Sequence, residues 1–345
     1  MTEISVGRRT IGDRHPAFVV AEIGSNHDGS LEQALKLIDM SADAGVDAVK
    51  FQTFRAAQHY SRRAPGFSYL DGRDTYSLIE SVELNRPWQA TLQRHAADRG
   101  VEFFSSPCDL EAVIELHDLA VPIFKVASFD ITDTVLVRSI AETGRPLVLS
   151  TGMASWAEIQ TALSAAESVG NDRVVLLQCT SLYPAPAHLA NLRAMASMRA
   201  AFGKLVGYSD HTLGDQMALA AVALGACFIE KHVTLDRTLP GPDHPFAMEP
   251  SELRTMMQRI RDVESGLGDG RKSGPRSEER EMAYKGRRSL HARVDIPMGS
   301  VVTDDMLVVK RPGLGITPVL REHIIGRKAA RQIEQDEWIT WDSLA

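Results

Sequence analysis

The chain has 345 residues, of which 44% are hydrophobic and 24% are charged, and its formal net charge at pH 7 is −7. This length exceeds that of a typical single domain, and the composition supplies a full hydrophobic core. The negative charge argues against a nucleic-acid partner, but it leaves room for a local basic pocket that binds one phosphorylated metabolite.

Short apolar runs rich in β-branched and aromatic residues predict eight strands along the chain. They lie at 18–23, 47–52, 101–105, 123–127, 147–150, 174–179, 205–208 and 227–230. Amphipathic helix patterns alternate with them, at 31–44, 86–99, 109–119, 133–143, 155–168, 189–202, 214–224 and 250–265. Eight such units predict the α/β class and a (β/α)8 TIM barrel, whose strand ends all point to one rim.

The long segment 53–85 interrupts the second unit of this pattern and is rich in Arg, Ser, Gly and Tyr. Loops of this length are usually functional covers or disordered. We expect this one to cover the mouth of the barrel.

The composition changes after residue 266 to Gly, Ser, Pro and dense charge, which is typical of a linker. Beyond it, short alternating strands are predicted, with little helical periodicity. We therefore predict a barrel domain over 1–270, a linker over 271–284 and a small β-rich domain over 285–345. A domain of about sixty residues is near the lower size limit for independent folding, so we expect it to lean on a partner surface.

The three cysteines, Cys108, Cys179 and Cys227, form no CxxC pair, and their odd number favours a reducing compartment. We interpret them as small core residues near strands. The N-terminus has scattered charges and no signal-peptide core, and no stretch reaches the roughly 20 apolar residues of a membrane span. We expect a cytoplasmic protein without a membrane partner.

Two histidines, His211 and His232, lie 21 residues apart, and each follows a short apolar run. This places both imidazoles at the ends of neighbouring strands, at the C-terminal rim where catalytic groups of barrels gather. A lone histidine at a strand end is more often structural. Two on adjacent strands indicate a divalent-metal site, because carboxylates are expected nearby on Glu22, Asp210, Glu230 and Asp243.

Two imidazoles leave most coordination positions of such an ion open. We expect a hard ion, Mn²⁺ first and Mg²⁺ or Co²⁺ as alternatives, to polarise a substrate aldehyde, and Zn²⁺ stays open.

Lysines and hydroxyl groups end most of the other predicted strands. Taken singly, each has an ordinary explanation as a cap or loop group, and a buried lysine is more often half of a salt bridge. Taken together they predict a cradle for a phosphate, because Lys supplies charge and Ser or Thr supplies short hydrogen-bond donors. The polar residues at the rim are Glu22, Asn26, His27, Lys50, Gln52, Ser105, Ser106, Lys125, Ser128, Ser150, Thr151, Thr180, Ser181, Tyr183, Ser209, Asp210 and Lys231.

Seven segments in order resemble the sialic acid synthases and their pseudaminic and legionaminic acid relatives, over almost the whole chain. They are AEIGSNH (21–27), VKFQT (49–53), FKVAS (124–128), STGM (150–153), QCTSLYP (178–184), YSDHT (208–212) and GPDH (241–244). The tail with Arg311-Pro312-Gly313 looks like the C-terminal antifreeze-like (SAF) domain of these enzymes.

The resemblance implies a condensation of phosphoenolpyruvate with an open-chain N-acetylmannosamine-type amino sugar, with release of phosphate. It implies that His211 and His232 hold the metal and that Gln52 and Asp130 contact substrate. The phosphate and carboxylate of phosphoenolpyruvate would be held by Lys50, Ser106, Lys125, Ser128, Ser150, Ser181 and Ser209.

The same resemblance implies roles at the sugar. Glu22 and Asp243 match positions that contact it and are candidates for proton transfer, provided that their surroundings separate their pKa values. Tyr183 would orient the sugar, and Arg311 would reach the site of a neighbouring subunit. A domain on a long linker can swap, so a domain-swapped homodimer is expected.

The sequence leaves the acceptor open. Phe129-Asp130 stands where many sialic acid synthases have a glycine and is more like the pseudaminic enzymes, whereas Asp243-His244 is more like the sialic and legionaminic enzymes. A diacetamido-trideoxyhexose, a less usual sugar and a sugar phosphate remain alternatives. Two other classes remain as well: a Schiff-base aldolase that uses Lys50, Lys125 or Lys231, and a carbohydrate-binding or ice-binding protein that acts through its tail.

Overall fold

The computed structural model describes residues 3–66 and 74–345 of the chain. These residues form two compact units, Met1–Gly268 and Asp269–Ala345. None of the described helices has both the length and the apolar character that crossing a bilayer requires.

The first unit contains the eight predicted strands in one parallel sheet. The strands are β3 (Phe18–Gly24), β4 (Ala48–Thr53), β5 (Glu102–Pro107), β6 (Phe124–Val126), β7 (Leu147–Ser150), β8 (Val174–Cys179), β9 (Leu205–Asp210) and β10 (Phe228–His232). Their hydrogen-bonded order is β5-β4-β3-β10-β9-β8-β7-β6, and the two end strands, β5 and β6, contact each other. The sheet is therefore a nearly closed barrel, which confirms the predicted TIM-barrel architecture.

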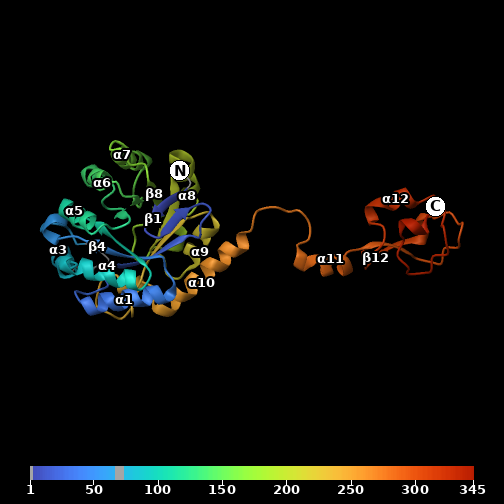
Figure 1. Cartoon of the computed structure of the whole chain (residues 1–345), viewed down its shortest axis with the longest axis horizontal. Helices are drawn as coiled ribbons and strands as arrows, with labels where there is room; N and C mark the ends of the chain where they lie inside the picture. The colour runs from blue at the N-terminus through green and yellow to red at the C-terminus, as the bar shows by residue number, and fades with distance from the viewer. Residues whose placement is uncertain (1–2, 67–73) are drawn as a thin grey trace. The chain divides into compact units, whose positions relative to one another are not determined.

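The predicted helices surround this sheet (Figure 1). They are α1 (Leu31–Ala44), α4 (Gln89–Asp98), α5 (Leu110–Asp118), α6 (Thr134–Glu142), α7 (Trp156–Glu167), α8 (Ala194–Phe202), α9 (Gln216–Ala223) and α10 (Pro250–Leu267). Local signals fix their ends. The Ser30 hydroxyl accepts a hydrogen bond from the Gln33 amide at 3.2 Å to begin α1, and Gly45 ends it with φ at 86°, a conformation that favours glycine.

A hairpin that the sequence pattern did not predict precedes the barrel, made of β1 (Glu3–Val6) and β2 (Arg9–Gly12). Its apolar side chains, Ile4, Val6 and Ile11, are buried in the main core. The Arg8 amide donates to the Glu102 carboxylate at 2.9 Å, at the start of β5, and the Arg9 guanidinium lies 3.6 Å from Asp47, just before β4. The hairpin therefore packs at the N-terminal end of the barrel strands, away from the rim.

The segment predicted to cover the barrel mouth contains two short helices, α2 (Ala56–His59) and α3 (Thr75–Ser81), and η2 (Arg86–Trp88) follows it at the start of the predicted helix 86–99. Residues 67–73 of this segment lie outside the described residues. Two further short elements follow in the barrel unit, η3 (Ala187–Leu189) and η4 (His244–Phe246).

The second unit has a small apolar core of its own, which includes Leu290, Ile296, Leu307, Ile333 and Ile339. Strands β11 (Ser289–Ala292) and β12 (Leu307–Lys310) pair antiparallel in it. Its other elements are η5 (Ser277–Glu279), α11 (Arg280–Gly286), η6 (Asp304–Met306), η7 (Pro318–Leu320), α12 (Arg321–Ile324) and η8 (Trp341–Ser343). The segment 271–284, for which we predict a linker, thus includes η5 and part of α11.

His27, in the turn between β3 and α1, is fully buried. Its Nδ1 atom accepts a hydrogen bond from the Gly29 amide at 3.0 Å. Burial lowers the pKa of this imidazole to about 4, although Asp28 opposes the shift. The side chain is therefore neutral in the folded protein under conditions in which the unfolded chain binds a proton.

This difference predicts a loss of stability in acid. As the pH falls from about 6.5 towards 4, the unfolded state gains a proton that the folded state does not take up, and the free energy of unfolding drops by about 3 kcal/mol. Urea unfolding at about pH 7 and about pH 4.5 measures the drop. A His27→Gln variant, which cannot titrate, should show a smaller drop by roughly this amount; an equal drop in both proteins would contradict the assignment.

Candidate active site

A cavity opens at the C-terminal ends of the barrel strands and collects most of the predicted site. The predicted residues that line it are Glu22, Lys50, Gln52, Ser106, Lys125, Ser128, Asp130, Ser150, Tyr183, Ser209, His211, His232 and Asp243. They come from eight different strands or the loops that follow them. The strand-end pattern in the sequence therefore predicted a real spatial cluster.

Strand register explains why these side chains meet. In the parallel pairs, Glu22 of β3 lies beside both Lys50 of β4 and His232 of β10. Glu230 of β10 lies beside Ser209 of β9. Since side chains of equal register on neighbouring parallel strands share a face, residues far apart in the sequence project into the same cavity.

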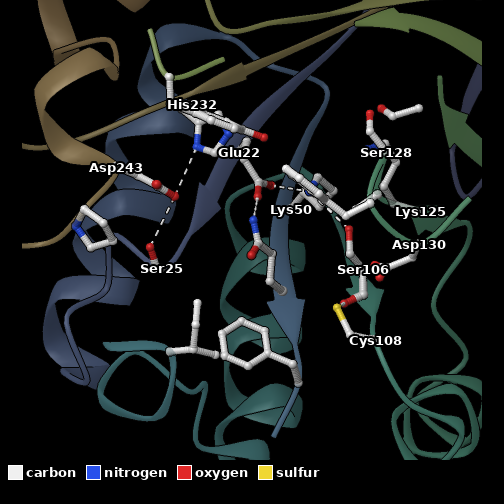
Figure 2. A pocket seen from close by; sticks show the side chains of 18 of the residues that line it. Glu22, Ser25, Lys50, Ser106, Cys108, Lys125, Ser128, Asp130, His232 and Asp243 are labelled. Carbon is white, nitrogen blue, oxygen red and sulfur yellow. Dashed lines mark hydrogen bonds and ion pairs between the residues drawn. The ribbon is translucent and has the colours of Figure 1, made fainter. Parts of the chain in front are cut away.

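Two buried lysines and two buried glutamates form a charge network at the centre of the cavity. Figure 2 shows Glu22, Lys50 and Lys125 of this network. The Lys50 ammonium lies 2.6 Å from the Glu22 carboxylate and 3.9 Å from Glu230, and it donates to the Ser106 hydroxyl at 3.2 Å. The Lys125 ammonium lies 3.3 Å from Glu230. Each lysine is therefore half of an ion pair and also lines the cavity. The salt-bridge interpretation of a strand-end lysine and its interpretation as a cavity residue are thus compatible.

The pKa values of the two glutamates are shifted in opposite directions. Burial raises the pKa of Glu22, and Glu230 adds to the rise, although Lys50 opposes it. Burial also raises the pKa of Glu230, but Lys125 and Lys50 outweigh it and the net pKa is lowered. For Lys50, burial lowers the pKa, and Glu22 and Glu230 more than offset this and raise it. The cavity thus holds a carboxyl group that favours its proton beside one that favours its charge, a pairing typical of acid–base sites.

Serine hydroxyls converge on Gly152 at one side of the cavity. The Ser128 Oγ atom accepts a hydrogen bond from the Gly152 amide at 3.0 Å. A Cβ on Gly152 would overlap the Ser128 and Ser181 hydroxyls, so only glycine leaves this space open. Ser150 Oγ and Ser181 Oγ are buried and have no hydrogen-bond partner in the described protein. Buried hydroxyls without partners are costly, and a bound anion would satisfy them.

The predicted metal ligands face each other. The rings of His211 and His232 have centroids 5.3 Å apart. His211 Nδ1 lies 2.9 Å from the Thr180 carbonyl oxygen, to which it donates, so its Nε2 atom keeps a lone pair. His232 Nδ1 is buried without a hydrogen-bond partner in the described protein, 3.6 Å from the Asp243 carboxylate.

The surroundings shift the pKa values of the two imidazoles in opposite directions. Burial lowers the pKa of His232 well below its usual value, and His211 and Lys50 lower it further, so this imidazole is neutral, as a metal ligand must be. Burial also lowers the pKa of His211, but the Cys179 sulfur and the Thr180 carbonyl outweigh it and raise the pKa. An unpartnered buried nitrogen, a second imidazole and a nearby carboxylate are a donor set that suits a divalent ion.

Asp243 and Tyr183 complete this side of the cavity. Burial raises the pKa of Asp243, although a hydrogen bond that Ser25 donates at 3.2 Å opposes the rise. The Tyr183 ring lies 4.3 Å from the His211 ring and 5.4 Å from the Phe246 ring, between centroids. Ser25 lies in the AEIGSNH segment and lines the cavity, but the sequence did not predict it as a site residue.

Two predicted residues are placed differently. Ser181 does not line the cavity itself, but its hydroxyl points at Gly152 beside it. Arg311 belongs to the second unit, where its Nε atom donates to the Gly286 carbonyl oxygen at 2.6 Å. Its role at a neighbouring site stays a prediction.

The sequence interpretation missed several lining residues. Cys227 is buried in the core and Cys179 is buried at the end of β8, as expected, although Cys179 also lines the cavity. Cys108 is only partly buried and lines the cavity, which corrects the expectation for this residue. Cys108 directly follows β5, so the strand-end pattern could have identified it. The covering segment contributes further lining residues, most of them apolar, which its sequence pattern did not indicate because its helices are short. They are Phe54, His59, Tyr60, Thr75, Leu78, Ile79 and Val82.

Known families match both units. A profile described as the NeuB family matches residues 37–272, and one described as the SAF domain matches residues 287–345. An N,N'-diacetyllegionaminic acid synthase of Campylobacter jejuni is 40% identical over 329 residues, which are 93% of this chain and 98% of that protein. The N-acetylneuraminate-9-phosphate synthase of Homo sapiens is 35% identical over 339 residues, which are 96% of this chain and 93% of that protein.

A solved structure agrees with these matches. The N-acetylneuraminic acid synthetase from Leptospira borgpetersenii, in complex with citrate, aligns with a TM-score of 0.74 and 35% identity over 81% of this chain and 94% of that one. Together with the barrel and its cavity, these matches define an enzyme of the nonulosonic acid synthase class. The chain belongs to the NeuB family and carries a C-terminal SAF domain, which confirms the resemblance seen in the sequence.

Proposed function

We propose that this protein condenses phosphoenolpyruvate with the open-chain form of an N-acetylmannosamine-type amino sugar in the cytoplasm, forming a nine-carbon 2-keto acid and phosphate. The observation that carries the proposal is one cavity that holds two facing imidazoles, two lysines and several hydroxyls. Relatives at 35% to 40% identity are named as synthases of such acids.

The lysines and serines would hold phosphoenolpyruvate. Lys50 and Lys125 are kept beside carboxylates and present charged ammonium groups to the cavity. The unpartnered hydroxyls of Ser150 and Ser181 supply donors that an anionic oxygen would accept from, and Ser106, Ser128 and Ser209 lie around them. Because the protein holds these hydrogen-bond donors in place before the ligand binds, no reorganisation energy is needed when negative charge develops on the ligand.

The histidines would hold the divalent ion, for which we propose Mn²⁺, with Mg²⁺ or Co²⁺ as alternatives. When bound, such an ion acts as a Lewis acid on the aldehyde oxygen of the sugar. The enol carbon C3 attacks the aldehyde, the cation that results at C2 lies beside the ionised Glu230, and water adds there before phosphate leaves. Glu22 and Asp243, whose pKa values are raised by burial, would transfer protons at the sugar.

Gln52, Asp130 and Tyr183 would orient the acceptor. One observation favours a second acceptor class, a diacetamido-trideoxyhexose: the apolar side chains of Phe54, Leu78 and Ile79 line the same cavity. A deoxy carbon and an acyl methyl group suit such a surface better than a phosphate does, because burying a charge without a partner is costly.

Phosphate release from phosphoenolpyruvate in the presence of Mn²⁺ tests the proposal. The acceptors are N-acetylmannosamine, its 6-phosphate and the two diacetamido-trideoxyhexoses, with a mixture lacking acceptor as the control. Release that depends on one of these acceptors is expected. No release with any of them would contradict the proposed reaction, and the ranking of rates assigns the acceptor.

The Schiff-base alternative requires a neutral amine in the cavity. Glu22 and Glu230 raise the pKa of Lys50 and keep it protonated. The Lys125 ammonium lies 3.3 Å from the Glu230 carboxylate, with which it forms an ion pair. Lys231 does not line the cavity, and its ammonium donates to Asp210 at 2.8 Å. Borohydride should therefore fail to inactivate the enzyme in the presence of substrate, and inactivation would favour the aldolase.

We also propose a domain-swapped homodimer in which Arg311 of one subunit serves the barrel of the other. Arg311→Ala and His211→Ala should each be inactive alone. In mixed dimers, one site combines an intact barrel with an intact tail, so co-expression should restore activity, to about a quarter of the wild-type level with random pairing. Activity of co-expressed, co-purified proteins measures this. No recovery, although mixed dimers form, would show that the tail acts within its own chain or not at all.

A further inference from the structure

A second group of metal-ligand side chains lies in the cavity, apart from the histidine pair. His59 ends α2, Cys108 follows β5 and Asp130 follows β6, and one ligand atom from each lies within 4.8 Å of the other two. All three line the cavity. Cys108 and Asp130 lie on the opposite side of the pocket from His232 and Asp243 (Figure 2).

The donor set is one that soft divalent ions prefer. A thiolate, an imidazole and a carboxylate bind Zn²⁺ at about 2.3, 2.0 and 2.1 Å, and a tetrahedral arrangement puts such atoms roughly 3.3 to 3.6 Å apart. The present separations, all within 4.8 Å, are of the order that side-chain rotations can close to this geometry. Three protein ligands leave a fourth position open, as in zinc sites that keep a water or substrate position.

The three side chains are available for this role. Cys108 is a free cysteine and is only partly buried. Its sulfur lies 3.9 Å from the Ser106 carbonyl oxygen and also interacts with the Asp130 side chain. In the described part of the chain, no cation lies within 4.0 Å of the Asp130 carboxylate. His59 packs against the rings of Phe54 and Tyr60, which hold the imidazole at the cavity wall.

We propose that His59, Cys108 and Asp130 form a second, thiophilic metal site that binds Zn²⁺. Binding exchanges the thiol proton of Cys108 for the ion. Because His59 comes from the covering segment and the other two ligands come from the barrel, the bound ion fixes α2 to the rim. Asp130 is a proposed sugar contact, so Zn²⁺ at this site excludes the acceptor. Only this last consequence rests on the proposed function.

Titration of the metal-free, full-length protein with Co²⁺, without substrates, tests the site by a signal that does not depend on turnover. Thiolate ligation of Co²⁺ gives a charge-transfer absorption in the near ultraviolet. We expect it in the wild type and in the matched variants Cys179→Ser and Cys227→Ser. It should vanish in Cys108→Ser, and His59→Ala should weaken the Co²⁺ affinity of this site at least about tenfold.

An absorption that is absent from the wild type, survives Cys108→Ser or disappears in Cys179→Ser would overturn the site. The His211→Ala variant separates this result from the catalytic proposal, because it should lose Mn²⁺ binding and keep the Co²⁺–thiolate absorption. Retained Mn²⁺ binding in that variant would contradict the proposed catalytic site and leave this one standing.

Inhibition of phosphate release by Zn²⁺ tests the consequence for the acceptor. We expect Zn²⁺ to raise the KM for the amino sugar and the inhibition constant to rise at least about tenfold in Cys108→Ser. Equal inhibition of the wild type and Cys108→Ser would refute the exclusion of the sugar by this ion.

Discussion

His211→Ala and His232→Ala should each lower kcat by about 10³-fold or more at saturating substrate, because a Lewis acid contributes several kcal/mol to the transition state and each 1.4 kcal/mol is a factor of ten. Added Mn²⁺ should not restore the rate. Phosphate release measures kcat, and Mn²⁺ binding to each variant measures the loss of the ion directly.

The fold should survive both changes. His232 Nδ1 is buried without a hydrogen-bond partner in the described protein, so removing this ring leaves no new unsatisfied group behind. His211→Ala removes the donor to the Thr180 carbonyl oxygen, a cost of about 1 to 3 kcal/mol that a folded domain can bear. Circular dichroism and the thermal midpoint check this. His117→Ala, an exposed residue in the last turn of α5, is the matched control and should keep the wild-type rate. Full activity in either cavity variant would refute the metal assignment.

Lys50→Met should lose both stability and activity, for two separable reasons. Removing Lys50 leaves the buried Glu22 carboxyl without its cation, so it must take up a proton; at pH 7 this costs about 3 to 4 kcal/mol in the free energy of unfolding. Removing a preorganised charge that faces the phosphate should also lower kcat by about 10²- to 10³-fold. Urea unfolding and phosphate release measure the two effects.

The double variant Lys50→Met/Glu22→Gln separates these effects. Replacing both partners removes the carboxyl group that must bind this proton, so most of the stability should return while activity stays low. Lys36→Met is the control, because Lys36 and Glu32 form an exposed pair on α1 and its loss should cost about 0.5 kcal/mol or less. Recovery of activity in the double variant would show that Lys50 serves only to neutralise Glu22.

The barrel was predictable because its signals are local. Each strand is a short apolar run, each helix has its own period, and residues such as Ser30 and Gly45 mark where a helix begins and ends. Since parallel strands bring their carboxyl ends to one rim, the lysines and histidines that follow them could be assigned to one site without coordinates.

The pairing within that site was not predictable in the same way. Lys50 and Glu230 are far apart in the sequence, and only the closure of the sheet brings both lysines to the same glutamate. The contribution of His59 was missed for a related reason. It ends a four-residue helix, too short to show a period, and its place beside Cys108 depends on how the covering segment packs. Arg311 lies in the other unit, where no strand register fixes its distance from the barrel.

The β1–β2 hairpin lies at the end of the barrel opposite the cavity, which bears on how reactants reach the site. Ile4, Val6 and Ile11 of the hairpin pack into the apolar core beneath the strands, whereas the cavity opens at the other end of the barrel, beside the covering segment. Both reactants are then expected to enter, and both products to leave, by the route that passes the covering segment. When substrates and products share one route, product release can limit kcat. We therefore expect substitutions near α3 to change the rate of product release more than the rate of the bond-forming step.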